Sequence, residues 1–167
     1  LLLTGFNRRF SPHISYLKEI ISNRSNPMII NYRMNAGHIP NDNWVHGEEG
    51  GGRNLGEACH IYDLFTDITG SKVNKINAHS INPMTDYYGV TDNFVAVISF
   101  EDGSVATLTY TALGAKDSPK EQMEIYCDGK VIKLDDYRTL EIFGSRNSGL
   151  NTKTMQKGQA EEIQSFG

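Results

Sequence analysis

The sequence has few cysteines, no cluster of basic residues and no long apolar run, and each of these features argues against a class of protein. Only two cysteines occur in 167 residues, Cys59 within a helical pattern and Cys127 at the end of a strand pattern. A disulfide framework is therefore not expected, and a reducing cytoplasm is the predicted location. Basic residues are scattered and the net charge is −4, which argues against a nucleic-acid partner. The apolar start is too short for a membrane span or a signal peptide, so no membrane contact is expected.

The share of hydrophobic residues, 38%, suffices for one core, so residues 1–167 are predicted to form a single domain. Residues 1–6 have the apolar character of a buried strand that runs into a loop. Ser11 and Pro12 are typical of a helix start, and apolar residues follow at helical spacing. Residues 28–34 suit a strand.

A second helix is predicted from Asn54, with Gly70 as its C-terminal stop. Its expected buried stripe consists of Leu55, Cys59, Tyr62, Phe65 and Ile68. After this helix the apolar residues alternate with a period of two, which indicates strands. The predicted strands are residues 73–80, 94–100, 104–112, 122–127, 130–134 and 139–143.

Turn signals and polar stretches separate these strands. Asp102-Gly103 and Asp128-Gly129 predict hairpins with primed turns, which need positive φ. Residues 144–159, rich in Ser, Asn, Gly and Lys, are predicted to form an exposed loop. The last residues are predicted to begin a short helix.

The strand at 94–100 is apolar on both faces, because Val95 and Val97 point away from the even-numbered residues beside them. Both faces of the sheet therefore need cover. Helices are expected on one face and a second copy of the chain on the other, since two-fold association is the commonest arrangement. The predicted fold class is α+β, with a mostly antiparallel open sheet of about six strands and oligomerisation through the uncovered face.

Three ionisable residues, Glu57, His60 and Asp63, are spaced by three and share one edge of the second predicted helix. One interpretation of Glu57 is a capping box with Asn54. On these residues alone, His60 is interpreted as a half-buried histidine at the edge of the core, with Asp63 as a partner that orients it or a loop. A metal site is the alternative, but neither a second Glu-x-x-His nor a H-E-x-x-H pattern supports it.

Three glycines, Gly50, Gly51 and Gly52, precede this helix. Exposed N–H groups at a helix start favour anions, so this turn is a candidate phosphate cradle. It has neither the G-x-G-x-x-G pattern nor the lysine of a P-loop. The other interpretation is that glycine lets a flat ring or another chain segment lie against the backbone.

A family resemblance is carried by three stretches in order: GFNRRFSPH (5–13), EEGGGRNLGEACHIYDLF (48–65) and SFEDGSVATLTYTA (99–112). They resemble the C-terminal domain of the Gfo/Idh/MocA oxidoreductases, NAD(P)-dependent enzymes that act mostly on sugars and cyclitols. GEACH and SPKE are most similar to the bi-domain oxidoreductases and the sugar-nucleotide dehydrogenases. The resemblance implies a glyceraldehyde-3-phosphate dehydrogenase-like C-terminal domain, with residues 1–10 ending a Rossmann domain that lies outside this chain.

In that family the helix presents a histidine to the substrate hydroxyl, which makes His60 a candidate general acid/base. Many members carry an aspartate four residues before this histidine, where the chain has Gly56. Glu57, one place later, is the candidate substitute. The resemblance also implies that nicotinamide and substrate approach the backbone at Gly51 and Gly52.

The remaining candidate ligands follow from the same resemblance. Arg8 and Arg9 lie at the expected junction and are candidates for binding the cofactor. Asn7, Trp44 and Asp63 are candidates for binding the substrate. No resident metal is expected.

Together these features predict the C-terminal substrate-binding and oligomerisation domain of an enzyme that uses NAD or NADP on a hydroxyl or keto group of a sugar or sugar nucleotide. The domain alone is expected to be inactive. Its expected partners are a sugar-like substrate, the Rossmann domain and further copies of the chain in a homodimer or homotetramer. A non-catalytic dimerisation or binding module of the same fold is the first competing interpretation. A metal hydrolase using the three ionisable residues is the second.

Overall fold

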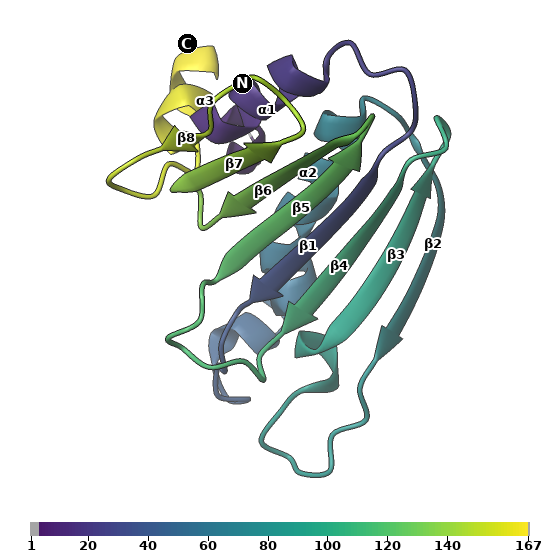
Figure 1. The fold of residues 1–167 in the computed structure, drawn as a ribbon. Coiled ribbons are helices and arrows are strands. Elements are labelled where there is room, and N and C mark those ends of the chain that lie inside the picture. The colour runs from purple at the N-terminus through teal and green to yellow at the C-terminus, as the bar shows by residue number, and fades with distance from the viewer. Residues whose placement is uncertain (1–3, 167) are drawn as a thin grey trace.

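The computed structural model describes residues 4–166, which form one open sheet with helices beside it (Figure 1). The eight strands lie in the order β2-β3-β4-β1-β5-β6-β7-β8. They are β1 (Ile29–Asn35), β2 (Val73–Ser80), β3 (Phe94–Phe100), β4 (Val105–Thr111), β5 (Glu121–Cys127), β6 (Lys130–Asp135), β7 (Thr139–Phe143) and β8 (Leu150–Asn151). All neighbours are antiparallel except β1 and β4, which pair in parallel. The predicted α+β class is confirmed, with a larger sheet than expected.

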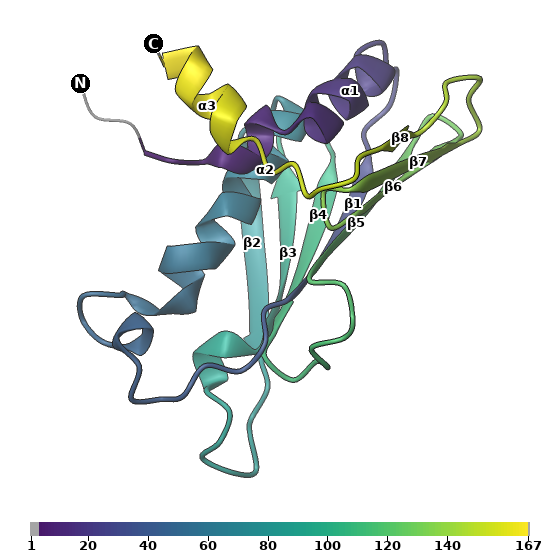
Figure 2. The same cartoon turned by 90° about the vertical axis from the view of Figure 1, so that its left-hand side faces the viewer.

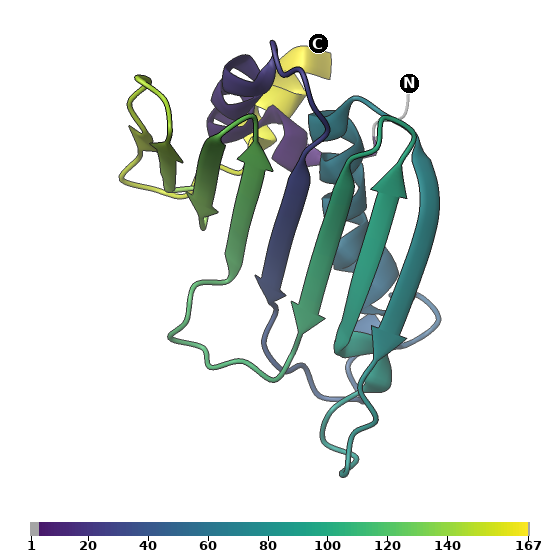
Figure 3. The ribbon, with the colours of Figure 1, turned by 45° about the vertical axis from the view of Figure 1, so that its right-hand side comes forward.

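The helices are α1 (Pro12–Ile21), α2 (Cys59–Thr69) and α3 (Gln159–Phe166). Shorter helical turns are η1 (Asn7–Phe10), η2 (Trp44–His46) and η4 (Val90–Asp92), and a π-helical stretch, η3 (Asn54–Ala58), leads into α2. As predicted, α1 begins with Ser11, whose side chain accepts a hydrogen bond from the N–H of His13. The three α-helices lie on one side of the sheet, and the other face is open (Figure 2, Figure 3).

The core lies between the helices and the face of the sheet that they cover. On β4, Ala106, Leu108 and Tyr110 are buried there, while the residues between them point to the open face and are only partly buried. This alternation follows from the two-residue period of a strand. The covered face is therefore apolar, and the open face remains accessible.

The buried stripe of α2 differs from the predicted one. Leu55 is 69% exposed, and Cys59 and Tyr62 are only partly buried. The residues that reach the core are Ala58, Ile61, Leu64, Phe65 and Ile68. For Leu55 the cause is the π-helical stretch, because its longer hydrogen-bonded turns rotate the residues before Cys59 relative to the rest of the helix.

The N-terminal strand prediction is wrong for the residues that the structure describes. Residues 4–6 are irregular and lead into η1, while residues 1–3 lie outside the described part. The predicted loop at 144–159 contains the two-residue strand β8 and ends at the first residue of α3. The helix expected at the end of the chain is confirmed as α3.

The two predicted hairpins are confirmed, but only one has a primed turn. Asp128 and Gly129 both have positive φ, 45° and 76°, as a type I′ turn requires. In the other hairpin, positive φ occurs at Gly103 (88°) but not at Asp102. The N–H of Phe100 donates to the carbonyl of Ser104 at 2.9 Å, so this connection is a three-residue loop that ends in glycine.

The corrected stripe of α2 can be tested with a matched pair of leucines. Leu64→Ala removes a fully buried side chain and should lower the free energy of unfolding by about 2–5 kcal/mol. Leu55→Ala removes a mostly exposed side chain and should change it by less than about 0.5 kcal/mol. Urea unfolding followed by circular dichroism gives both values, and equal losses would contradict the rotated register.

Candidate functional site

His60 lies on α2, on the side toward the N-terminal segment. Its ring meets the edge of Phe6 with centroids 5.7 Å apart and planes at 84°. Its Nδ1 is buried and has no hydrogen-bond partner within residues 4–166. Burial lowers the pKa of this imidazole and the nearby Arg8 guanidinium lowers it further, so the ring is neutral at neutral pH.

Glu57 forms no capping box, which corrects that interpretation. Its carboxylate accepts hydrogen bonds from Lys120 at 2.7 Å, Tyr110 at 2.5 Å and Arg53 at 3.0 Å. Asn54, the expected cap, instead accepts a hydrogen bond from the Tyr62 hydroxyl at 2.8 Å. Burial alone would raise the pKa of the Glu57 carboxyl, but the three donors outweigh burial and lower the pKa to about 2. Glu57 is thus ionised throughout the physiological range.

Arg53 connects this carboxylate to the loops at the end of the sheet. Its guanidinium donates to the carbonyls of Gly37 at 2.5 Å and Ala36 at 3.0 Å, in the segment that follows β1. A second carboxylate, Asp92 in η4, lies 3.8 Å from it. Three chain segments that are distant in sequence therefore meet at Glu57 and Arg53.

Asp63, expected to orient His60 or a loop, makes no hydrogen bond to His60 but pairs with the N-terminal segment. It is paired with Arg9 of η1, whose Nε donates to Oδ2 at 2.8 Å, with a second contact between Nη2 and Oδ1. The Asp63 carboxylate therefore holds η1 against α2. The side chain of Arg9 remains one-third exposed.

Arg8 is buried rather than open to a cofactor. Its guanidinium donates to both carboxylate oxygens of Glu121 on β5, at 2.7 and 3.2 Å. Tyr32 donates to the same carboxylate at 2.5 Å, and the ammonium of Lys157 contacts it as well. Although burial alone would raise the pKa of the Glu121 carboxyl, the charges of Arg8 and Lys157 lower it. Glu121 is therefore a buried and ionised anchor.

The other residues predicted to bind substrate or cofactor differ in their exposure and contacts. Asn7 is buried, and its amide donates to the carbonyl of Lys157 at 2.8 Å. Trp44 is 68% exposed in η2. Gly51 and Gly52 both have positive φ, and a side chain at Gly52 would meet no atom within 4 Å.

Gly50 shows that another chain segment does approach the glycine turn. A Cβ at this position would lie 2.4 Å from the carbonyl oxygen of Val45 and 2.6 Å from that of Trp44. No side chain fits at such distances. Glycine is therefore required here by the contact with η2.

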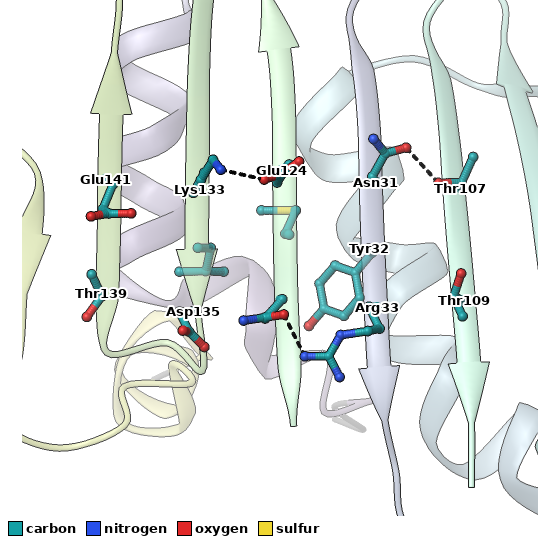
Figure 4. Close-up of a pocket in the computed structure, with 13 residues that line it drawn as sticks. Asn31, Tyr32, Arg33, Thr107, Thr109, Glu124, Lys133, Asp135, Thr139 and Glu141 are labelled. Carbon is teal, nitrogen blue, oxygen red and sulfur yellow. Dashed lines mark hydrogen bonds and ion pairs between the residues drawn. The ribbon is translucent and has the colours of Figure 1, made fainter. Parts of the chain in front are cut away.

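A broad hollow lies on the opposite side of the sheet from His60. It has a volume of about 670 Å³ and opens on the uncovered face between β4 and β7 (Figure 4). Its lining is mostly polar and includes Arg33, Glu124, Lys133, Asp135 and Glu141. Because α2 is on the other face, the predicted catalytic residues do not line this hollow.

Sequence reasoning missed four residues that hold the site together: Arg53, Tyr110, Lys120 and Glu121. Two of them belong to the SPKE stretch, whose resemblance to the family was noticed without any role being assigned to it. The structure gives that stretch a role, because Lys120 pairs with Glu57 of the GEACH stretch. Each of these contacts joins residues far apart in sequence, apart from the pair of Arg53 with Glu57.

Comparison with known proteins agrees with the fold. Residues 26–133 match the GFO/IDH/MocA C-terminal domain, and the chain therefore belongs to the Gfo/Idh/MocA family. An uncharacterized oxidoreductase of Bacillus subtilis strain 168, YrbE, is 30% identical over 112 residues, which are 64% of this chain and 32% of YrbE.

Solved structures share this fold. UDP-N-acetylglucosamine 3-dehydrogenase GnnA from Acidithiobacillus ferrooxidans superposes with a TM-score of 0.71 at 22% identity, covering 99% of this chain and 51% of that one. Levoglucosan dehydrogenase, solved with NADH and levoglucosan, gives a TM-score of 0.71 at 18% identity, covering 96% of this chain and 54% of that one. The chain thus spans about a third of its curated relative and about half of each solved enzyme.

Neither a metal cluster nor a membrane-spanning helix occurs among residues 4–166. Within residues 4–166, no group of three or more His, Cys, Asp or Glu side chains is placed to hold a metal ion. In the same part of the chain, every helix is too short or too polar to cross a bilayer.

The low pKa of Glu57 predicts a pH-dependent contribution to stability. The folded-state pKa of about 2 lies below the ordinary value of 4.5, so the ionised carboxylate stabilises the fold above pH 4.5. This stabilisation is lost as the pH falls toward 2. At neutral pH, Glu57→Gln should lower the free energy of unfolding by about 1–3 kcal/mol, as measured by urea unfolding.

The pH series distinguishes this effect from a general loss of packing. The difference between wild type and Glu57→Gln should stay constant down to about pH 4.5 and then shrink. Glu49→Gln, which changes an exposed carboxylate in the preceding turn, should show no difference at any pH. If the difference in free energy of unfolding between wild type and Glu57→Gln stayed constant at acid pH, the low pKa of Glu57 would be contradicted.

Proposed function

We propose that this chain is the C-terminal substrate-binding and oligomerisation domain of an NAD(P)-dependent oxidoreductase that acts on a hydroxyl or keto group of a sugar or sugar nucleotide. The observation that carries the proposal is the setting of His60. A neutral, half-buried imidazole sits beside the segment that leads in from the N-terminal side, and both lie on the helix-covered face. Family membership and the dehydrogenases that share the fold support the reaction class.

The proposed role of His60 is that of a general acid/base. In the oxidation direction, the neutral ring accepts the proton of the substrate hydroxyl while the carbon loses hydride. In reduction, the imidazolium returns that proton to the alkoxide oxygen. A base must be unprotonated at the working pH, and burial of this imidazole favours that form. Glu57 stays anionic in this scheme, which suits it to orient a substrate hydroxyl and not to donate a proton.

The glycine turn is the proposed place where the cofactor approaches the backbone. A Cβ at Gly52 would meet no atom within 4 Å, which fits the approach of a flat nicotinamide ring, whereas a Cβ at Gly51 would lie 3.3 Å from the Leu55 side chain. When bound, NAD(P) supplies the hydride acceptor or donor. The partly exposed Arg9 is the proposed contact for a cofactor phosphate, and Asn7, Trp44 and Asp63 remain proposed near the substrate.

The proposed oligomer uses the open face of the sheet. A row of apolar residues crosses this face in register, formed by Val105, Ile29, Tyr126, Val131 and Phe143. Val95 and Val97 of β3 add further apolar surface, 44% and 40% exposed. Apolar residues gathered on an accessible sheet face are typical of an interface between copies of a chain.

Replacing the proposed base should reduce turnover in the full-length protein. His60→Ala should lower kcat with NAD(P) and a sugar-type alcohol by about two orders of magnitude, because proton transfer then depends on water. Its neighbour Cys59, changed to Ala, should retain most of the activity. In the wild type, kcat/KM for oxidation should fall only below about pH 6.5, and this acid limb should be absent from the residual activity of His60→Ala.

The competing interpretation, a non-catalytic dimerisation or binding module, makes the opposite prediction. Titration of the full-length protein with NAD and NADP, followed by calorimetry, would show no binding of either. An unchanged rate in His60→Ala would make the histidine structural. Turnover by the isolated residues 1–167 would contradict the assignment of hydride transfer to a separate domain.

The open-face oligomer is tested with a matched pair of isoleucines. Ile29→Glu places a charge in the apolar row and should shift the protein toward monomer in size-exclusion chromatography with light scattering. Ile163→Glu changes a more exposed isoleucine on α3, on the other side of the sheet, and should leave the mass unchanged. Dissociation by both variants, or by neither, would place the interface elsewhere.

A further inference from the structure

The carboxylate of Glu121 collects polar groups from distant parts of the chain. Arg8 comes from η1, Tyr32 from β1 and Lys157 from the segment before α3. Tyr137, fully buried in the turn after β6, lies 3.2 Å from the Tyr32 hydroxyl oxygen. Glu121 itself is 1% exposed. Charge-assisted hydrogen bonds at such burial depend strongly on geometry, so they fix the positions of their donors.

One of those donors belongs to the segment of residues 5–11, here named the junction segment. The chain before α3 lies across it. Asn7 donates to the carbonyl of Lys157 at 2.8 Å, and the Ser11 hydroxyl donates to the carbonyl of Gln156 at 2.6 Å. Gly158 comes so close that a Cβ there would lie 2.4 Å from the carbonyl oxygen of Asn7. The junction segment is therefore fixed from two sides, by the sheet and by the C-terminal segment.

The junction segment in turn sets the position of His60. Phe6, two residues before Arg8, places its ring at 84° to the imidazole plane. Arg9 binds Asp63, one turn further along α2 from His60. With Nδ1 unpartnered among the described residues, no hydrogen bond to this nitrogen orients the ring. Its orientation depends on packing against Phe6.

We propose that Arg8 and Glu121 are positioning residues for His60: their buried pair fixes the junction segment, and the junction segment fixes the imidazole through Phe6. This inference rests on the proposed general acid/base role of His60. It replaces the expected contact of Arg8 with the cofactor, because both oxygens of Glu121 already engage the guanidinium. The proposal extends to Lys157, which joins the C-terminal segment to the same anchor.

The charged groups around His60 make the proposal testable by a pH profile. Arg8 on η1 lowers its pKa, whereas Glu121 on β5, Glu57 on η3 and Asp63 on α2 raise it. Glu121→Gln should therefore lower the pKa of His60, and Arg8→Gln should raise it. Both variants should lower kcat in the full-length protein by roughly 10- to 100-fold, because both release the junction segment.

The double variant Arg8→Gln/Glu121→Gln distinguishes the electrostatic effect of the pair on His60 from its effect on the position of the imidazole. The two removed charges act on His60 in opposite directions, so its pKa should return toward the wild-type value. The anchor is still lost, so kcat should remain low. Recovery of kcat together with the pKa would show a purely electrostatic role and overturn the proposal.

The measurements are the acid limb of kcat/KM and a histidine titration by NMR with ¹³C-labelled imidazole, assigned by the loss of one signal in His60→Ala. Lys18→Gln breaks a more exposed ion pair between α1 and α2, away from the junction segment, and should change neither the acid limb nor the pKa of His60. Thermal melts verify that each variant is folded. Single variants that keep wild-type kcat while His60→Ala is inactive would overturn this inference alone. An active His60→Ala would overturn the proposed function, whereas the NMR titration would still report the opposite pKa shifts.

Discussion

An ionised carboxylate leaves water only if charged and hydrogen-bonding groups replace the water, and Glu121 imposes this requirement on the whole domain. The groups that meet it come from η1, from β1 and from the segment before α3: Arg8, Tyr32 and Lys157. A single residue therefore brings both ends of the chain to the same part of the sheet. Removing one partner would leave an uncompensated charge in the core, so the anchor acts as one unit.

A second carboxylate, Glu57 in η3, is held in a similar way just before α2 begins. Glu57 is held by Arg53, Tyr110 and Lys120, and Arg53 also binds the backbone of the loop after β1. His60 lies on the helix between the two groups. Partial burial and the nearby guanidinium of Arg8 lower its pKa and favour the neutral ring, whereas the two carboxylates raise its pKa and oppose that state.

The regular elements could be predicted because their signals are local. Ser11 and Pro12 mark the start of α1, and the two-residue alternation from β3 to β7 identifies the strands. The register of α2 could not be predicted, because a π-helical stretch leaves no simple mark in hydrophobic spacing. The partners of Glu57, Arg8 and Asp63 were missed for a different reason. Apart from Arg53, which lies four residues before Glu57, these partners are distant in sequence, and neither periodicity nor motif spacing reports which distant charge a buried carboxylate meets.

The position of β1 affects how the sheet can assemble. Strands β2 to β4 form one set of sequential neighbours and β5 to β8 another, and β1 is the strand that joins the two sets. Each set can form early from local contacts, whereas β1 must wait until β4 and β5 have been synthesised to gain both neighbours. During translation an apolar strand thus remains unpaired while most of the domain is made. The pairing of β1 with both β4 and β5 is then a late step that closes long loops and joins the two sets of strands into one sheet.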